Sequence, residues 1–292
     1  MSQLLANTVV TAAVALLVAI SFSLIYWVGR FFHFALGGIL VVGAYLAYAL
    51  HTELGSSIIM SVALAAVGCA ALGAMLEWLV HRPLRSRGAS SVTLLLASLG
   101  VYVILINLVT LMWGEQVRLL LAAQSPLAIQ ILGARLSPVR LMILFSAGAV
   151  ALACWLFLKH TGPGKVFRAV ASNPEVARIC GIVEGPVQFA AIIASSVLGA
   201  YVGVLAASDG DLRPGMGLPL LILGVATALI GEGGGVAGLA AGAFMVSVGQ
   251  TISVWFFGMQ WRDAATLILL LVALFIRHAR GTDRSRTVRE RA

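Results

Sequence analysis

Charged residues are scarce in this chain: Asp, Glu, Lys and Arg make up only 10% of its 292 residues, against roughly 25% in an ordinary soluble domain. Hydrophobic residues make up 61%, and the mean hydropathy is +1.03. No polar block is longer than the stretch near residues 114–140, so no second, soluble domain is indicated. Because lipid is the solvent for such a composition, we expect residues 1–292 to form one all-α, polytopic membrane domain.

Cysteine is almost absent, and the usual motifs of catalysis are missing. Cys69, Cys154 and Cys180 lie far apart, with no CxxC and no Cys/His cluster, which argues against disulfide and metal sites. The GPGKV stretch at 162–166 lacks the preceding glycine and the Ser or Thr of a nucleotide-binding loop, and neither HExxH nor GxSxG occurs. We therefore expect no enzymatic activity, no metal and no cofactor on this chain, with any ATP bound by separate subunits.

Long apolar runs separated by short polar stretches define the candidate membrane spans. A helical crossing needs about 20 residues, which predicts eight or nine crossings, with the segments 31–50 and 218–231 uncertain as full spans. Glycine-rich, broken or re-entrant segments are expected at 30–45 and 231–242, because glycine weakens a helix interior. The candidate spans are 4–28, 31–50, 56–80, 90–113, 139–158, 187–207, 218–231, 236–257 and 263–277.

The net charge of +8 is distributed unevenly between the loops. Most of the 19 Lys and Arg residues fall near Arg30, in the loop 81–88, in the loop 159–184 and in the tail 278–292, which alternation of the spans puts on one side. The positive-inside rule makes that side cytoplasmic, so the N-terminus is predicted outside and the C-terminus inside. This pattern accounts for the basic charge with no nucleic-acid partner. The outer loop 114–138 is expected to hold a short hairpin or an interfacial helix, and 208–217 is expected to form turns.

The segment Gly162–Ile182 is the longest one that cannot lie in lipid, and its second half spells out a short helix. Asn173 suits the N-cap and Pro174 the first helical position. Glu175 lies in the first turn, Arg178 lies near the other end, and Gly181 can end the helix in the left-handed conformation. A helix this short is unstable alone. We therefore predict that it docks on a separate cytoplasmic protein.

A few polar and glycine residues within or beside the spans are candidates for a transport path. Helix packing and hydrogen bonding between helices explain the same residues, because small residues spaced by four let helices approach closely and buried polar groups need partners. Glu77, four residues before His81, is expected to form an interfacial pair. The path candidates are His33, Gly37, Gly38, Asn107, Ser195, Ser196 and Glu232, and the packing candidates are Gly234, Gly238 and Gly242.

Three stretches together resemble the permease subunits of the high-affinity ABC importers for branched-chain amino acids. They are GPGKVFRAVASNPEVARICGI at 162–182, FALGGILVVGAY at 34–45 and WRDAATLILLLVALFIR at 261–277. The resemblance implies a multi-pass protein of the bacterial inner membrane. It also implies a second permease chain in a heterodimer, two cytoplasmic ATPase subunits and an extracytoplasmic solute-binding protein. The coupling residues it implies are Arg168, Ala169, Asn173, Pro174, Glu175, Ala177, Arg178, Gly181 and Ile182.

The chain departs from the family pattern at one place. Members usually carry Asn-Phe-Ala-His-Gly-Glu where this chain has His33-Phe34-Ala35-Leu36-Gly37-Gly38. Such a difference is expected of a divergent member, and it leaves the solute open between a branched-chain amino acid and urea, an amide or another small polar molecule. The alternative function is a self-sufficient secondary transporter or channel, which the glycine-rich breaks favour and the lack of ion-coupling groups disfavours.

Overall fold

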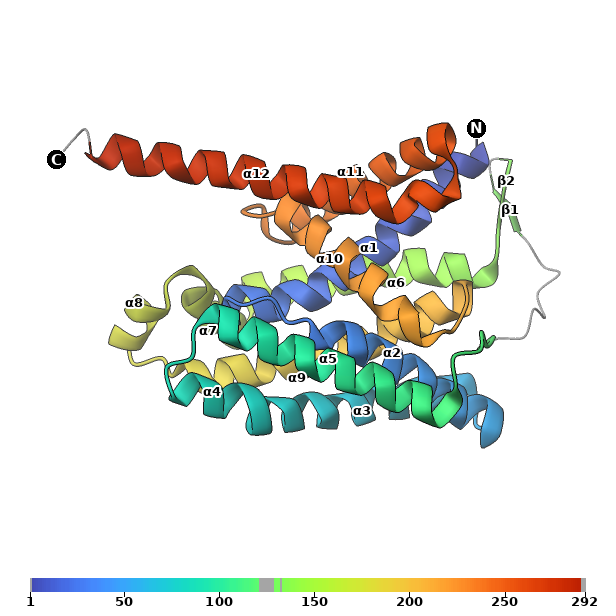
Figure 1. The fold of residues 1–292 in the computed structure, drawn as a ribbon, viewed down its shortest axis with the longest axis horizontal. Coiled ribbons are helices and arrows are strands. Elements are labelled where there is room, and N and C mark those ends of the chain that lie inside the picture. The colour runs from blue at the N-terminus through green and yellow to red at the C-terminus, as the bar shows by residue number, and fades with distance from the viewer. Residues whose placement is uncertain (1, 121–128, 132, 290–292) are drawn as a thin grey trace.

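The computed structural model describes residues 2–120, 129–131 and 133–289, with side chains in the last helix up to Phe275 (Figure 1). The described chain is almost entirely helical. Its helices are α1 (Ser2–Gly29), α2 (Ala35–Tyr48), α3 (Ile58–Leu76), α4 (Arg82–Ser86), α5 (Ser91–Trp113), α6 (Pro138–His160), α7 (Gly162–Ser172), α8 (Pro174–Ile179), α9 (Glu184–Asp209), α10 (Gly217–Ile230), α11 (Gly235–Phe257) and α12 (Arg262–Arg289). The helices α3, α5, α6 and α12 run along the long axis, whereas α1 and α10 are inclined to it (Figure 1).

Seven helical segments of the described chain are long and apolar enough to cross a membrane. Two of them include π-helical turns: Ala49–Glu53 extends α2, and Glu77–His81 joins α3 to α4. The segment Pro214–Ile230 is apolar but shorter, as the sequence suggested for 218–231, whereas 31–50 overlaps Ala35–Glu53, which is long enough. An all-α, polytopic membrane protein is therefore confirmed, and the predicted number of crossings stays a prediction.

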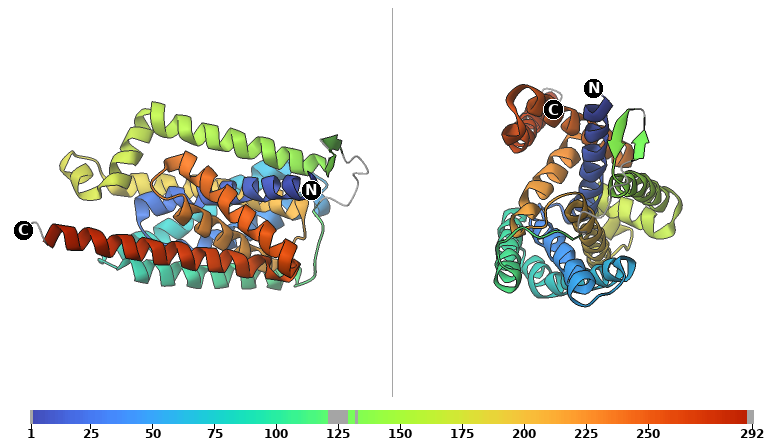
Figure 2. Two further views of the ribbon diagram at one scale, coloured as in Figure 1. Left: turned by 90° about the horizontal axis from the view of Figure 1, so that it is seen from above. Right: turned by 90° about the vertical axis from the view of Figure 1, so that its right-hand side faces the viewer.

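The core lies where α1, α2 and α9 pack together. In the most apolar stretch of each of these spans more than half of the residues are buried, whereas in α3, α5 and α6 only 22% are. Seen end on, α1 runs through the middle of the bundle, with α6 and α5 on opposite sides of it (Figure 2). Small residues let the inner helices approach closely: a Cβ on Gly43 of α2 would collide with the backbone of Ala200 on α9. This packing places the two helices in direct backbone contact.

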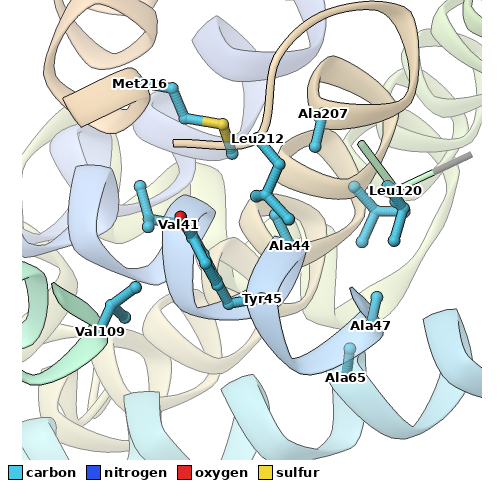
Figure 3. Close-up of a cluster of buried hydrophobic side chains, with 11 residues drawn as sticks. Val41, Ala44, Tyr45, Ala47, Ala65, Val109, Leu120, Ala207, Leu212 and Met216 are labelled. Atoms are coloured by element: carbon cyan, nitrogen blue, oxygen red, sulfur yellow. The ribbon is translucent and has the colours of Figure 1, made fainter. Parts of the chain in front are cut away.

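A cluster of buried apolar side chains closes one end of the core. Tyr45 of α2 lies at its centre, beside Val41 and Ala44, with Val109 of α5 and Leu212 of the loop after α9 around it (Figure 3). Next to this cluster, Arg118 pairs with Leu212 through two backbone hydrogen bonds of 2.9 and 3.0 Å. The loops that follow α5 and α9 are therefore held together against the end of α2.

The two ends of the bundle carry different structures. The N-terminus and the hairpin of β1 (Ile129–Ile131) and β2 (Ala134–Leu136) lie at one end, and α4, α8 and the C-terminal end of α12 lie at the other (Figure 1). The strands are antiparallel, with Gln130 opposite Arg135. Of the two structures expected in the loop 114–138, the hairpin is the one that forms, although residues 121–128 and 132 lie outside the described chain.

The helices are interrupted in both stretches expected to be broken, but in the first the break precedes the glycines, because Gly37, Gly38 and Gly43 lie within the continuous helix α2. α1 ends at Gly29 and α2 begins at Ala35, with Arg30 at φ +54° between them. In the second stretch, a turn at 231–234 separates α10 from α11. A Cβ on Gly238 would collide with the carbonyl oxygen of Gly231, and one on Gly242 with that of Thr227. The glycines thus permit both a sharp turn and very close packing of α10 on α11.

The loops contain more helix than the sequence indicated. In the segment 162–182, α8 is the short helix predicted for the second half, and α7 is a further helix in the first half. Within 208–217, which was expected to form turns, Ser208 and Asp209 complete the last turn of α9, and Pro214–Met216 form a 3₁₀ turn that continues directly into α10. The tail 278–292 continues α12 as far as Arg289, and residues 290–292 lie outside the described chain.

Candidate coupling site at the α8 end of the bundle

The short helix α8 has the capping contacts that the sequence predicts. Oδ1 of Asn173 accepts hydrogen bonds from the backbone N–H groups of Glu175 (3.0 Å) and Val176 (3.2 Å). Pro174 occupies the first helical position, and Gly181 has φ +79°. The N–H of Ile182 donates to the carbonyl of Ala177 (3.0 Å), which closes the other end. The caps thus satisfy backbone groups that six helical residues alone would leave unpaired.

One side of α8 is buried and the other is exposed. Ala177 is buried against the bundle, together with Phe167 and Val170 of α7. In contrast, Val176 is 53% and Ile179 is 85% exposed. Burying a side chain of this kind stabilises a protein by about 1.5–3 kcal/mol. α8 therefore presents apolar surface that its own chain leaves uncovered.

The helix α7 supports α8 and is itself tied to the bundle. Its N-cap is Thr161, whose Oγ1 accepts a hydrogen bond from the N–H of Gly164 (3.0 Å). At its other end, Nη2 of Arg30 donates to the carbonyls of Ala171 (3.1 Å) and Ser172 (2.9 Å). A guanidinium at a helix C-terminus pairs with the unsatisfied carbonyls and with the negative end of the helix dipole. Arg30 thus connects the α1–α2 break directly to the segment that carries α8.

The charged residues predicted for coupling are exposed on α7 and α8. Arg168 is exposed on α7, and Ala169 beside it is half-buried. On α8, Glu175 and Arg178 are exposed, and Nη2 of Arg178 contacts Oε1 of Glu184 at 2.7 Å. The residues predicted to couple to an ATPase therefore lie in α7, in α8 and in the residues that cap α8, and their docking partner stays a prediction.

A groove of about 1030 Å³ separates α8 and the start of α9 from α4. Its polar lining includes Arg82, Arg85 and Arg178, and its apolar lining includes Trp78 and Phe189. The groove was not predicted from the sequence, because residues near 82 and near 185 meet only in the folded chain.

Glu77, which was expected to form an interfacial pair with His81, lies in the wall of this groove with only 2% of its surface exposed. Its Oε1 forms an ion pair with Arg85, and its Oε2 lies 3.7 Å from Nδ1 of His81, which is also buried. Arg85 lies eight residues further along the chain, one helical element away. The pair with Arg85 was not predicted, because helix-surface pairs are usually sought at a spacing of three or four residues.

The predicted path residues are not brought together. His33 is buried, with its ring 5.0 Å from that of His81. Ser195 and Ser196 are buried in α9, where Oγ of Ser21 donates to the Ser195 carbonyl (2.8 Å). The remaining members are spread over the fold: Gly37 and Gly38 pack in α2, Asn107 is exposed on α5, and Glu232 is exposed in the turn before α11.

None of these seven residues lines the groove beside α4. In the described chain, hydrogen bonding and packing between helices account for the serines and the two glycines, and the path assignment stays a prediction.

A second polar cluster, which the sequence did not indicate, lies at the opposite end of the bundle. There Nε of Arg140 contacts Oδ1 of Asp209 at 2.8 Å, and Arg262 reaches Thr11 of α1. These residues come from four helices that are far apart in the sequence. Only the Arg262-Asp263 pair had been noted, as part of the stretch 261–277.

Comparison with known proteins agrees with this architecture. Residues 4–275 match the family model for the branched-chain amino acid transport system permease component. The chain is 24% identical to the high-affinity branched-chain amino acid transport system permease protein BraD of Pseudomonas aeruginosa, over 94% of this chain and 93% of BraD. It is 22% identical to the corresponding permease protein LivH of Salmonella typhimurium, over 94% of this chain and 92% of LivH.

The fold is also found in a solved structure, PsaBC from Streptococcus pneumoniae in complex with a Fab. The match has a TM-score of 0.50 and 16% identity, over 94% of this chain and 91% of the other. The similarity to BraD and LivH, together with the apolar helices, makes the chain a multi-pass protein of the bacterial inner membrane. The match of the family model over residues 4–275 shows that the chain belongs to the permease component family of branched-chain amino acid ABC transport systems.

Proposed function

We propose that this chain is the membrane-spanning permease subunit of an ATP-driven importer for branched-chain amino acids or a related small solute. The observation that carries the proposal is the capped helix α8, which exposes Val176 and Ile179 on a segment that cannot lie in lipid. A partner that covers these two side chains would remove their apolar surface from water, which favours binding. The partner that we propose is one of two cytoplasmic ATPase subunits.

Movement of α8 would reach the bundle through two contacts. Ala177 packs into the apolar cluster that includes Ala191 of α9, and Arg30 joins the end of α7 to the break between α1 and α2. α1, α2 and α9 are the most buried spans. A displacement of α8 by an ATPase would therefore act on the core helices and not on a peripheral loop.

The proposed orientation puts the α8 end in the cytoplasm. Arg30, Arg82, Arg85, Lys165 and Arg168 gather at the end of the chain's fold that carries α4, α7 and α8, which the positive-inside rule assigns to the cytoplasmic side. The N-terminus and the β1–β2 hairpin then face outward, where an extracytoplasmic binding protein would deliver solute. A second permease chain would complete the path.

The proposal is tested by assembling the chain with its partner subunits in proteoliposomes and measuring ATP-dependent uptake. Ile179→Asp should abolish ATPase binding and uptake while leaving membrane insertion unchanged, because it puts a charge on the exposed apolar face of α8. Arg213→Glu, at an exposed position at the other end of the bundle, is the control and should bind the ATPase normally. Uphill uptake by the purified chain without ATP would instead support a secondary transporter.

A further inference from the structure

The end of the bundle opposite α8 contains a cavity of about 190 Å³. Its walls come from α1, α6, α9, α11 and the segment that begins α12. Pockets for drug-sized ligands measure about 300–1,000 Å³, so this cavity has room for a small solute only. In the proposed orientation it lies on the extracytoplasmic side.

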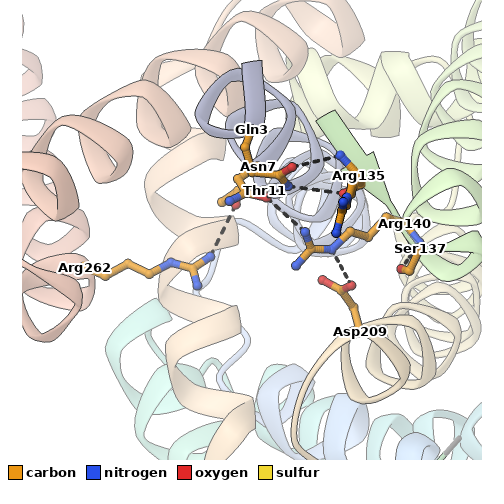
Figure 4. Close-up of polar contacts among 8 residues, drawn as sticks. All are labelled: Gln3, Asn7, Thr11, Arg135, Ser137, Arg140, Asp209 and Arg262. Carbon is orange, nitrogen blue, oxygen red and sulfur yellow. Dashed lines mark hydrogen bonds and ion pairs between the residues drawn. The ribbon is translucent and has the colours of Figure 1, made fainter. Parts of the chain in front are cut away.

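One of the two arginines of the cavity is neutralised. Nε of Arg140 donates to Oδ1 of Asp209 (2.8 Å), and its Nη1 donates to Oδ1 of Asn7 (2.9 Å) (Figure 4). Both contacts have normal hydrogen-bond lengths. The second carboxylate oxygen of Asp209, Oδ2, makes no hydrogen bond to the described side chains.

The other arginine lacks a carboxylate. Nη2 of Arg262 lies 3.4 Å from Oγ1 of Thr11, and its Nε lies 3.4 Å from Oε1 of Gln250 (Figure 4 shows the first contact). Both distances are beyond the usual N–H···O range of 2.7–3.2 Å, and both partners are neutral. Among the side chains that the structure describes, none forms an ion pair with Arg262. The guanidinium is half-buried, so its charge is only partly solvated.

The two guanidinium groups converge on one face of α1. Asn7 and Thr11 are four residues apart, and side chains with this spacing lie on neighbouring turns, with about 5–6 Å between their Cβ atoms. The cavity therefore holds two positive charges against the single negative charge of Asp209. Its other walls include the apolar side chains of Val10 and Val254. An uncompensated cation beside an apolar wall is complementary to a small carboxylate with an apolar side chain.

We propose that this cavity is a solute-binding subsite that holds the carboxylate of a small apolar amino acid at the extracytoplasmic side. Arg262 is the carboxylate anchor, because a guanidinium binds a carboxylate through two parallel hydrogen bonds. The ammonium group faces Oδ2 of Asp209, and the side chain lies against Val10 and Val254. This inference rests on the proposed function and adds to it the residues of this chain that recognise the solute.

The binding test compares three probes on the assembled importer in nanodiscs, without the binding protein. The probes are L-leucine, 4-methylpentanoate, which lacks the ammonium group, and 3-methylbutylamine, which lacks the carboxylate. Isothermal titration should detect L-leucine and 4-methylpentanoate but not the amine. Equal binding of the amine and L-leucine, or no binding of L-leucine, would overturn the proposal. This comparison needs no variant.

The residue assignment is tested by substitution. Arg262→Gln should weaken L-leucine binding at least about tenfold, as expected when a charge-assisted hydrogen bond is lost, and Arg262→Lys should weaken it less. Arg213→Gln, which removes an exposed arginine at the same end, is the matched control and should bind normally. If Arg262→Gln does not assemble, Thr11→Val, which removes the hydroxyl facing Arg262, should weaken binding several-fold. Unchanged affinity in both variants would refute the anchor.

A role for Arg262 in holding α12 to α1 and α11 would give a different result. It would lower the melting temperature without distinguishing the probes that carry a carboxylate from the one that does not. Measurements of ATP-dependent uptake distinguish failure of the proposed subsite from failure of the proposed function. If the wild-type importer transports L-leucine and Arg262→Gln leaves the KM unchanged, the subsite is wrong and the proposed function stands. If no ATP-dependent uptake occurs, the proposed function itself fails.

Discussion

Replacing Asn173 by alanine tests whether the cap of α8 matters for coupling. The substitution removes the acceptor of two hydrogen bonds, from the N–H groups of Glu175 and Val176. Losing an N-cap of this kind costs about 0.5–2 kcal/mol. α8 has only six residues, too few to be stable without its caps and its contact through Ala177. We therefore expect α8 to fray and its affinity for the ATPase to fall.

The size of this effect follows from the cost of reforming the helix on binding. If reforming α8 on binding costs about 1 kcal/mol, the affinity of the ATPase for the permease falls about fivefold. The range of about 0.5–2 kcal/mol corresponds to a fall of about 2- to 30-fold. Biolayer interferometry of the ATPase on nanodisc-embedded permease measures this change. Hydrogen exchange should show faster exchange at Glu175 and Val176 and unchanged protection in α9.

Asn173→Ser is the matched control, because a serine hydroxyl also accepts hydrogen bonds at the N-cap. It should restore both the ATPase affinity and the slow exchange. If Asn173→Ala binds the ATPase as tightly as the wild type while α8 exchanges faster, then α8 is not the docking helix. If exchange does not change either, the cap does not stabilise α8 and the energetic argument is wrong.

Three further predictions concern the parts that support α8 and the core. Arg30→Gln should speed hydrogen exchange at the end of α7 and reduce uptake without changing membrane insertion, because the α7 carbonyls lose a charged donor; unchanged exchange would contradict this. Gly43→Val should lower the melting temperature or prevent folding, because the side chain collides with the Ala200 backbone and overpacking costs about 1–3 kcal/mol; an unchanged thermal transition would refute the close contact. Glu77→Gln should destabilise the protein by about 3–5 kcal/mol, since it leaves a partly buried arginine without its carboxylate. Glu184→Gln is the control and should cost at most about 1 kcal/mol, because its partner Arg178 is 72% exposed. Equal shifts in melting temperature for the two variants would show that burial does not determine how much each ion pair stabilises the protein.

The sequence alone determined the features of this protein that depend on neighbouring residues. The apolar runs predicted the membrane helices, because crossing a bilayer is a matter of length and composition. The caps of α8 were also predictable, since Asn173, Pro174 and Gly181 act on backbone groups within a few residues of themselves. The glycine-rich stretch at 231–242 indicated a break for the same reason.

Tertiary structure alone decided which distant residues meet. Arg30 finds the end of α7, Glu77 is buried with Arg85, and Arg140 pairs with Asp209, each through the packing of helices whose relative positions no local pattern encodes. Asn107, which looked like a buried polar group in a span, lies exposed on α5. The spacing of residues in the sequence shows which of them share one face of a helix. Only the assembled bundle decides whether that face packs against another helix or is exposed. For this reason the spans and caps were predictable, while the charge pairs, the groove beside α4 and the cavity at the opposite end were not.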